Sequence, residues 1–327
     1  MKPLLPALAL LTASLFCASL LIGPAALGLG ESLHALLTGE GGPVVLVMQE
    51  IRLPRAILGL LVGAALGLSG AAMQGFLRNP LAEPGLIGVS ASAALGAVIT
   101  LQTGLAAAFT LALPLAALAG AGGASLLILM LAGPRGGALA LILAGIAISA
   151  LAGAMTSLVL NLSPNPFAAA EIVYWMMGSL ADRSFTHVWL AAPFILAGMA
   201  ALMTLGRGLD AMTLGEDAAE SLGIRPARLR LVLIVGTSAA VGASVAVAGA
   251  IGFVGLVVPH ILRPLVGARP SRLLPASALG GSAVLLAADI ATRLIAPERD
   301  LKLGVLTALV GAPFFLHLIW KMRRIEA

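Results

Sequence analysis

The chain has 327 residues, 60% of them hydrophobic and only 10% charged, with a net charge of +5. Globular proteins carry about 25% charged residues, so this chain has too little polar surface to stay soluble as a monomer. Apolar runs long enough to cross a bilayer recur from end to end and leave no separate soluble domain. The sequence therefore predicts one transmembrane domain over residues 1–327, in which positive charge marks topology rather than nucleic-acid binding.

Residue types that support catalysis or metal binding are sparse. Cys17 is the only cysteine, which excludes an intrachain disulfide and a thiolate metal cluster. The four histidines lie in separate segments, and no His-Glu-x-x-His pattern occurs. An intramembrane enzyme would need a paired nucleophile and base, or a set of metal ligands. We therefore expect no catalytic residue, no metal site and no cofactor.

Apolar runs between charged or proline-containing breaks predict an all-α polytopic membrane protein with about ten transmembrane helices. In chain order the spans cover 4–29, 54–77, 85–102, 105–132, 138–161, 187–206, 229–250, 252–267, 273–296 and 303–320. With the N-terminus in the cytoplasm, 13 of the 19 lysines and arginines fall inside and 6 outside. This asymmetry predicts that both termini are cytoplasmic.

The first span has a second interpretation. Lys2 and the apolar run after it also fit a cleaved secretory signal. Its removal would leave nine spans and spoil the charge pattern, so we favour a retained span.

The second span contains a glycine row and ends in a proline-broken turn. Gly59, Gly63 and Gly67 recur every four residues, and such a row lets helices in lipid approach closely. Tight packing within one subunit is the favoured explanation, with a dimer interface as the alternative. The polar turn 78–85 that follows is typical of a transport pathway rather than of a passive anchor.

Three arginines are predicted at the outer rim. Arg52 and Arg55 lie at the entry to the second span, and Arg293 lies at the exit of the ninth. Arginines at helix ends commonly anchor a membrane protein. The charge rule disfavours them outside, however. An acidic partner on the outer face would explain them through charge-assisted hydrogen bonds.

The outer segment 171–180 combines aromatic residues and methionines. Tyr174 and Trp175 fit an interfacial belt. Met176 and Met177 beside them are soft and adaptable, so a short helix here could instead line or gate a pathway. On the aromatic residues alone, the belt is slightly favoured.

The longest cytoplasmic loop, 207–230, is amphipathic rather than simply polar. Leu209, Met212, Ala219 and Leu222 can share one side of a short helix pair, with acidic residues on the other. Such a stretch is commonly a solvated loop. A docking surface for a cytoplasmic partner is an equally good explanation.

The eighth span, 252–267, is short and contains two prolines together with His260 and Arg263. Broken backbone at membrane depth survives only inside protein or beside a water-filled cavity. We therefore expect this span to be interior and the turn 249–255 to dip below the outer surface. Spans 2–5 and 7–10 each pair a glycine-rich span with a broken segment, which is weakly consistent with an inverted repeat.

Asp289 is an ionisable residue inside the ninth span and is therefore a candidate functional residue. Arg293 lies one turn away, and an ion pair between the two is the simplest explanation. A carrier driven by an ion gradient would need further buried carboxylates. Glu83, Glu171 and Asp182 are all predicted near a membrane surface, which argues against that alternative.

Together these segments resemble the permease subunits of binding-protein-dependent ABC importers for iron–siderophores, haem and cobalamin, the type II or FecCD-like group. The resemblance covers nearly the whole chain. It rests on the motifs at 51–55, 69–75, 78–88, 174–178, 214–216, 249–263, 303–307 and 311–313. It implies a type II ABC importer permease fold in the bacterial inner membrane, working as a homodimer whose pathway lies on the dimer axis.

The resemblance also assigns roles to residues. The segment 207–224 becomes the coupling segment that touches two cytoplasmic ATPase subunits, through Leu209, Leu214, Gly215, Glu216, Ala219 and Gly223. Arg52, Arg55 and Arg293 would pair with glutamates of a periplasmic binding protein. The span 138–161 and the helix carrying Tyr174, Trp175, Met176 and Met177 would line the pathway, which weakens the belt interpretation.

The resemblance finally implies an energy source and a cargo class. No Gly-x-x-x-x-Gly-Lys-[Ser/Thr] phosphate loop is present, so ATP would be bound and hydrolysed by the partner subunit. Iron–siderophore is the first choice of cargo, with cobalamin and haem as alternatives. The sequence itself does not select among them.

Overall fold

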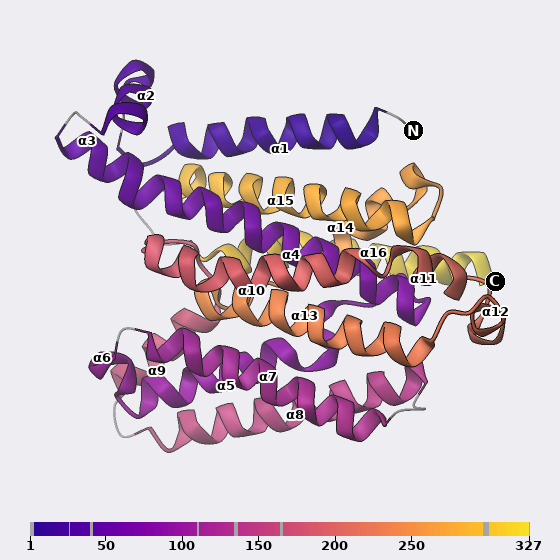
Figure 1. The fold of residues 1–327 in the computed structure, drawn as a ribbon. Coiled ribbons are helices and arrows are strands. Elements are labelled where there is room, and N and C mark those ends of the chain that lie inside the picture. The colour runs from indigo at the N-terminus through magenta and orange to yellow at the C-terminus, as the bar shows by residue number, and fades with distance from the viewer. Residues whose placement is uncertain are drawn as a thin grey trace.

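The computed structural model describes residues 3–25, 27–39, 42–109, 111–133, 137–163, 166–296 and 301–326. These residues form helices joined by short turns, and no strand occurs among them. The long helices lie side by side in one bundle, as Figure 1 shows. The predicted all-α class is confirmed for this part of the chain.

Ten helices follow the ten predicted apolar segments in order. They are α1 (Leu4–Leu21), α4 (Leu53–Leu77), α5 (Val89–Gln102), α7 (Ala112–Ala132), α8 (Ala138–Asn161), α10 (Phe185–Met203), α13 (Pro226–Ala248), α14 (Val254–Leu262), α15 (Pro270–Ile295) and α16 (Leu303–Glu326). Seven helical segments of the described chain are long and apolar enough to cross a membrane. These are α1, the continuous stretch Pro43–Leu77 that contains α4, α7, α8, α10, α13 and α15. The apolar helices α5 and Leu303–Leu318 are shorter, and α14 has only nine residues.

Short helices connect the long ones. They are α2 (Leu29–Thr38), α3 (Pro43–Val45), the π-helix η1 (Leu46–Arg52), the 3-10 helices η2 (Pro84–Ile87) and η3 (Pro264–Val266), α6 (Leu105–Ala108), α9 (Pro166–Met176), α11 (Gly206–Met212) and α12 (Glu216–Ser221). The predicted first span, 4–29, was too long, because α1 ends at Leu21 and α2 begins at Leu29. Gly23 and Pro24 lie in that break, where proline cannot continue a helix.

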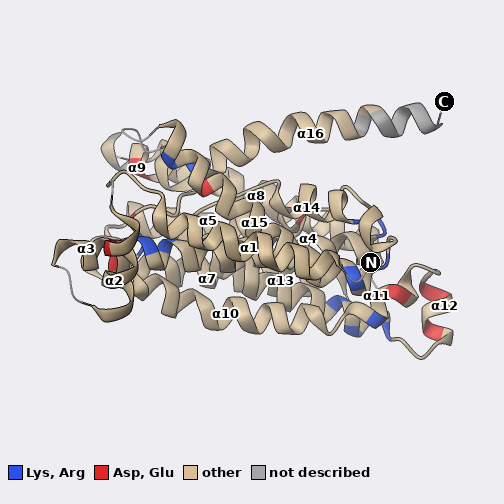
Figure 2. Ribbon diagram, turned by 90° about the horizontal axis from the view of Figure 1, so that it is seen from above, with Lys and Arg blue, Asp and Glu red and all other residues tan. Residues whose placement is uncertain are grey.

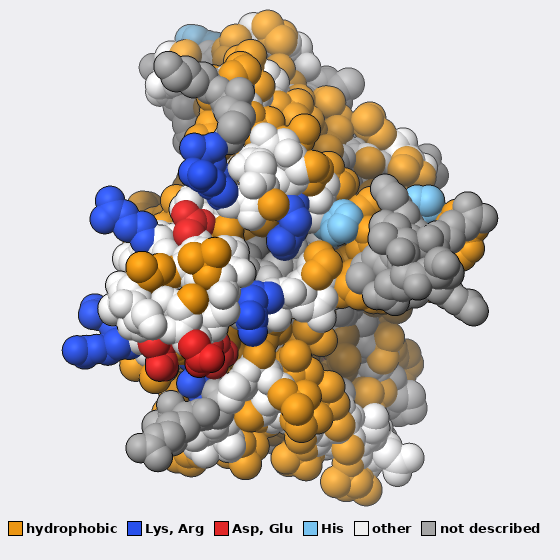
Figure 3. All heavy atoms as spheres, turned by 90° about the vertical axis from the view of Figure 1, so that its right-hand side faces the viewer, with side chains coloured by type: hydrophobic (Ala, Val, Ile, Leu, Met, Phe, Trp, Pro, Cys, Tyr) orange, Lys and Arg blue, Asp and Glu red, His pale blue; other side chains and the backbone are white. Residues whose placement is uncertain are grey.

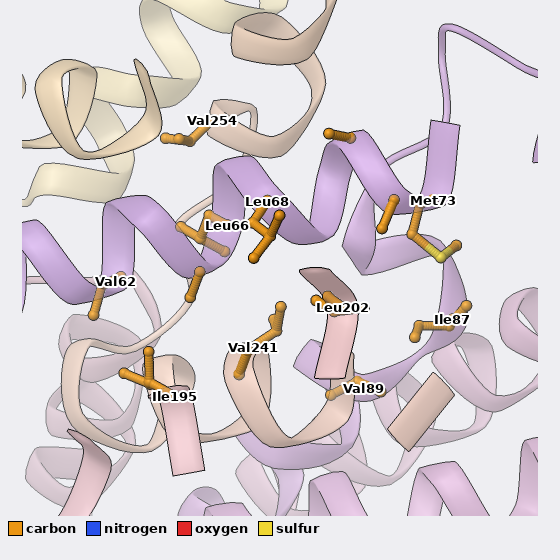
Figure 4. Close-up of a cluster of buried hydrophobic side chains, with 14 of the residues drawn as sticks. Val62, Leu66, Leu68, Met73, Ile87, Val89, Ile195, Leu202, Val241 and Val254 are labelled. Atoms are coloured by element: carbon orange, nitrogen blue, oxygen red, sulfur yellow. The ribbon is translucent and has the colours of Figure 1, made fainter. Parts of the chain in front are cut away.

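Burial separates central from peripheral helices. Within an 18-residue apolar stretch of each helix, 83% of the residues are buried in Pro43–Leu77 and 78% in α13, but only 17% in α1. Figure 4 shows Leu66 and Leu68 of α4 in one cluster with Leu202 of α10 and Val241 of α13. Since lipid gives no hydrophobic drive for helix association, this dense centre depends on close packing.

The glycine row of α4 packs inside the subunit. A Cβ added at Gly63 or Gly67 would collide with the backbone of α15 at Ser277, Gly281 or Ser282. The favoured interpretation of this row, tight packing within one chain, is therefore confirmed.

The bundle has two charged ends. Figure 2 shows lysine, arginine and acidic residues gathered at both ends, with few charges along the helices between them. One end carries α2, α3 and α9 and is called the α2 end below. The opposite end, the α12 end, carries α11, α12 and the start of α1 (Figure 1).

Candidate functional site

The predicted coupling segment, residues 207–224, projects from the α12 end as two short helices. Leu209, Met212 and Ala219 are fully buried and hold α11 and α12 against the bundle. Leu209 packs at Gly75 near the end of α4, where its Cδ1 lies 3.3 Å from the position a Cβ would take. These buried positions fix the segment's place rather than offering a contact surface.

The exposed face of the coupling segment carries Leu214 and Leu222, which are 69% and 63% exposed. Figure 3 shows hydrophobic side chains bordered by acidic ones at this end. The predicted side shared by Leu209, Met212, Ala219 and Leu222 is therefore wrong for Leu222. Gly215 and Gly223 have φ values of +111° and +81°, so the chain turns at both and places the two leucines outside.

Asp210 connects the coupling segment to the bundle. Its Oδ1 accepts a hydrogen bond from the backbone N–H of Ser271 at 2.9 Å, and its Oδ2 accepts one from the Ser271 hydroxyl at 2.6 Å. Ser271 lies in the first turn of α15, where free N–H groups favour a carboxylate. These two hydrogen bonds fasten α11 to the start of α15.

A buried charge cluster lies near the α2 end. Asp289 is 1% exposed and pairs with Arg293 at 2.9 Å and with Arg55 at 2.8 Å. The predicted Asp289–Arg293 ion pair is confirmed. Arg55, on α4, adds a second partner that sequence spacing within one helix could not indicate. The cluster ties α4 to α15.

Two of the three predicted rim arginines are buried. Arg52 donates hydrogen bonds to the carbonyls of Leu20, Leu21 and Ala25, at 3.0, 2.9 and 2.6 Å. Arg293 donates to the Ser19 carbonyl at 2.9 Å and to the Ser19 hydroxyl at 2.7 Å. Both arginines thus satisfy the C-terminal carbonyls of α1.

The arginines differ in access to solvent. Arg52 and Arg293 are 4% and 8% exposed, whereas the side chain of Arg55 is 19% exposed. Docking of a binding protein by these residues stays a prediction. Arg55 has the most free surface of the three.

The four pathway candidates lie on two sides of the end of α9. Tyr174 and Trp175 face a cavity of about 440 Å³ that is lined by both charged and apolar residues, and the Lys302 ammonium lies 5.5 Å from the centre of the Tyr174 ring. Met176 and Met177 face a second, mostly apolar cavity of about 620 Å³ beside α16. The sequence grouped these residues together, but the structure separates the aromatic pair from the methionine pair.

A glycine junction, formed by Gly178 and Gly249, lies between residues that line the two cavities. A Cβ at Gly249 would approach the Trp175 carbonyl to 2.5 Å, and one at Gly178 would approach the Ala250 carbonyl to 2.6 Å. Both glycines have a φ near +70°. Other residues rarely adopt this conformation, so the junction requires glycine on conformational and steric grounds.

The two proline-broken segments meet inside the bundle, which the sequence did not foresee. Glu83 Oε1 accepts a hydrogen bond from the Phe253 N–H at 2.9 Å. Nearer the α12 end, Gln74 donates to the Leu256 carbonyl at 3.2 Å and accepts from Arg263 at 2.7 Å. The expectation that the eighth span is interior is confirmed by the burial of α14.

The expectation that Glu83 lies near a surface is wrong. Glu83 lines a cavity together with Leu66, which is at the middle of the 25-residue α4. The turn at Arg78 has a φ of 50° and sends the following residues back along α4. The two prolines that flank Glu83 were the available signal, because broken backbone at membrane depth marks an interior site.

No group of three or more potential metal ligands among His, Cys, Asp and Glu occurs in the described residues. What the geometry offers is mechanical. A coupling segment is fastened to a central helix, two interior segments are braced against each other, and two cavities lie beside a glycine junction. This arrangement, with the apolar helices around it, defines a multi-pass helical membrane protein.

Comparison with known proteins agrees with this class. Residues 10–321 match the FecCD transport family. The chain is 41% identical to a cobalamin import permease of Halobacterium salinarum over 84% of this chain and 73% of that protein. It is 38% identical to an Fe(3+)-citrate import permease of Bacillus subtilis over 97% of this chain and 95% of that protein.

A solved structure has the same fold. It is described as an inward-facing conformation of a metal-chelate type ABC transporter, and it superposes with a TM-score of 0.86 at 33% identity. The match covers 98% of this chain and 100% of the other. The chain belongs to the FecCD transport family. It is accordingly an ABC importer permease and not an enzyme, located in the inner membrane as a multi-pass protein.

Proposed function

We propose that this chain is half of a homodimeric permease that moves a metal chelate from the periplasm to the cytoplasm, powered by ATP hydrolysis in a partner subunit. The proposal takes the α2 end as periplasmic, the α12 end as cytoplasmic, and ten spans with both termini inside. The attachment of the coupling segment to α15 through Asp210 and Ser271 is the observation that carries it. Through this attachment, an ATPase that moves the coupling segment would also move α15, the helix that packs along α4.

Each end of the molecule has a separate task in this proposal. The exposed Leu214 and Leu222, with Glu216 beside them, contact the ATPase, while Leu209 and Ala219 hold the coupling segment in place. Gly215 and Gly223 shape its turns. ATP binds only to the partner, whose two arrangements bias the permease between outward-open and inward-open states.

The cargo enters at the α2 end from a periplasmic binding protein. Arg55 supplies a partly exposed charge for an acidic residue of that protein, and Arg293 shares the Asp289 counter-charge with it. Arg52 holds the end of α1 through the carbonyls of Leu20 and Leu21. The methionine side of α9 and the start of α16 form the mouth of the pathway. Apolar, partly empty space of this kind suits a bulky cargo held weakly.

The proposed dimer would cover exposed helix faces. Leu143, Leu151 and Leu158 of α8 are 57%, 56% and 56% exposed, and Leu309 and Leu316 of α16 are both 66% exposed. Figure 2 shows α16 leaning away from the bundle. A second copy would cover these faces across the pathway.

The cargo is an iron chelate in our first choice and cobalamin in our second, because relatives named for both are similarly close. Haem is a third candidate within the same class. The test is uptake by proteoliposomes that contain this chain, its ATPase and its binding protein. ATP-driven uptake of one chelate, abolished by an inactive ATPase, is expected. Uptake that runs on a proton or sodium gradient without the ATPase would overturn the proposal.

A further inference from the structure

Glu83 places a partly buried carboxylate beside a cavity at the level of the middle of α4. It comes six residues after the end of α4, yet it lines a cavity of about 170 Å³ with Leu66, Ser90 and Gly252. The middle of a membrane-spanning bundle is an expensive place for an ionisable group. Its presence there calls for a partner or a function.

Only one of the two oxygens of this carboxylate accepts a hydrogen bond from a described residue. Oε1 accepts the Phe253 N–H, at the start of α14, where the free N–H groups of the first turn also favour negative charge. Within the described part of the chain, this is the hydrogen bond that Glu83 makes. Oε2 can therefore accept from water or from a ligand, and the bond to Phe253 holds the carboxylate beside the cavity.

The cavity at Glu83 adjoins the larger cavity beside α16. Ala250 and Gly252 line both spaces. The larger one is otherwise walled by apolar residues, among them Met176, Met177 and Leu309. Among the described residues that line these two cavities, Glu83 is the one with a charged side chain.

We propose that Glu83, with Ser90 beside it, is a charge-selective contact site that takes hydrogen-bond-donating groups of the passing cargo. A carboxylate accepts hydrogen bonds and donates none. It therefore favours ammonium, amide and hydroxyl groups and disfavours anionic ones, and the effect is strong because apolar walls reduce screening. The inference rests on the proposed function, since it requires the two cavities to belong to the pathway.

The test measures how charge affects access to this site without requiring a known cargo. Cys17 is exposed, so the background is Cys17→Ser. Gly85→Cys supplies the probe position, because Gly85 lines the cavity at Glu83 and a Cβ there meets nothing within 4 Å. The assembled transporter in nanodiscs is reacted with methanethiosulfonate reagents that carry ethylammonium, hydroxyethyl or ethylsulfonate groups. Each rate is divided by the reagent's rate with a free thiol.

We expect the ammonium reagent to react fastest and the sulfonate slowest, with a spread of about five- to tenfold. Glu83→Gln should collapse the spread while leaving the melting temperature unchanged, because its amide oxygen can still accept from Phe253. Leu309→Cys, in the larger cavity, is the matched control and should show a smaller spread with Glu83 present. The inference would be overturned if the spread of normalised rates were the same in the Glu83 protein and in Glu83→Gln. It would also be overturned if Gly85→Cys never reacted.

The labelling and uptake experiments can reject the contact site and the importer independently. A Glu83-dependent spread without ATP-driven uptake would count against the proposed importer but leave the contact site standing. Uptake with a spread that Glu83→Gln does not change would keep the importer and reduce Glu83 to a brace between the loop after α4 and α14.

Discussion

Asp210 and Ser271 join the coupling segment to α15 through two hydrogen bonds, one to the backbone and one to the hydroxyl. Asp210→Ala removes both acceptors and leaves the Ser271 N–H without a partner. Hydrogen bonds to a charged group contribute about 1.5–3 kcal/mol, so a modest fall in melting temperature is expected. The larger effect should be on coupling. ATP hydrolysis should continue while uptake per ATP falls several-fold.

Asp217→Ala is the matched control, because Asp217 is an exposed acidic residue of the same segment. It should change neither rate. Normal uptake per ATP in Asp210→Ala would show that the Asp210–Ser271 contact does not transmit movement.

The exposed leucines of the coupling segment give a second prediction. Leu214→Asp combined with Leu222→Asp should abolish co-purification of the ATPase, since apolar anchors near the centre of an interface dominate its affinity. Both side chains are exposed, so the permease itself should fold normally and keep its melting temperature. Ser221→Asp, at an exposed neighbouring position, should have little effect. Full ATPase recovery with the double variant would place the docking surface elsewhere.

The helices and their order were predictable because apolar runs and charged breaks act locally along the chain. The long loop 207–230 was located in the same way. Its orientation was not, because the faces of α11 and α12 depend on the turns at Gly215 and Gly223. The sequence pattern put Leu222 with buried residues, whereas the chain direction after Gly215 leaves it exposed.

Contacts between distant segments escaped prediction for a different reason. The pairing of Asp289 with Arg293 follows from helical spacing, but its pairing with Arg55 requires knowing that α4 packs along α15. The meeting of Glu83 with Phe253 depends likewise on both broken segments entering the bundle. Composition marks such residues as unusual without showing what they contact.

The buried charge cluster makes a third prediction. Asp289→Asn leaves Arg55 and Arg293 without their shared counter-charge, and breaking a buried pair in this way costs about 3–5 kcal/mol. The melting temperature should fall strongly. Adding Arg55→Gln to Asp289→Asn should recover part of the loss, because, among the described residues, the hydrogen bonds and ion pair of Arg55 all go to Asp289. Asp182→Asn is the control, because Asp182 is exposed. A melting temperature unchanged in Asp289→Asn would mean that the cluster contributes nothing to stability.

Arg55 provides the fourth prediction, on docking of the binding protein. Arg55→Gln should weaken docking about tenfold and reduce its dependence on salt, because an accessible charge pair is lost. Titration of the binding protein against the nanodisc-held transporter at two salt concentrations measures both effects. Since Arg55 also pairs with Asp289, the melting temperature must be measured in parallel. Unchanged affinity in a folded variant would exclude Arg55 from the docking surface.

The glycine row gives the last prediction. Gly67→Ala would drive a methyl group into the backbone of α15 at Ser277, and neighbouring Gly281 leaves no room for α4 to shift. Overpacking of this kind costs about 1–3 kcal/mol or more, so thermal unfolding in detergent should begin at a lower temperature. Gly122→Ala on α7 is the matched control, because a Cβ there meets nothing within 4 Å and alanine is the better helix former. A Gly67→Ala protein as stable as the Gly122→Ala protein would mean that close contact between α4 and α15 does not hold the centre of the bundle together.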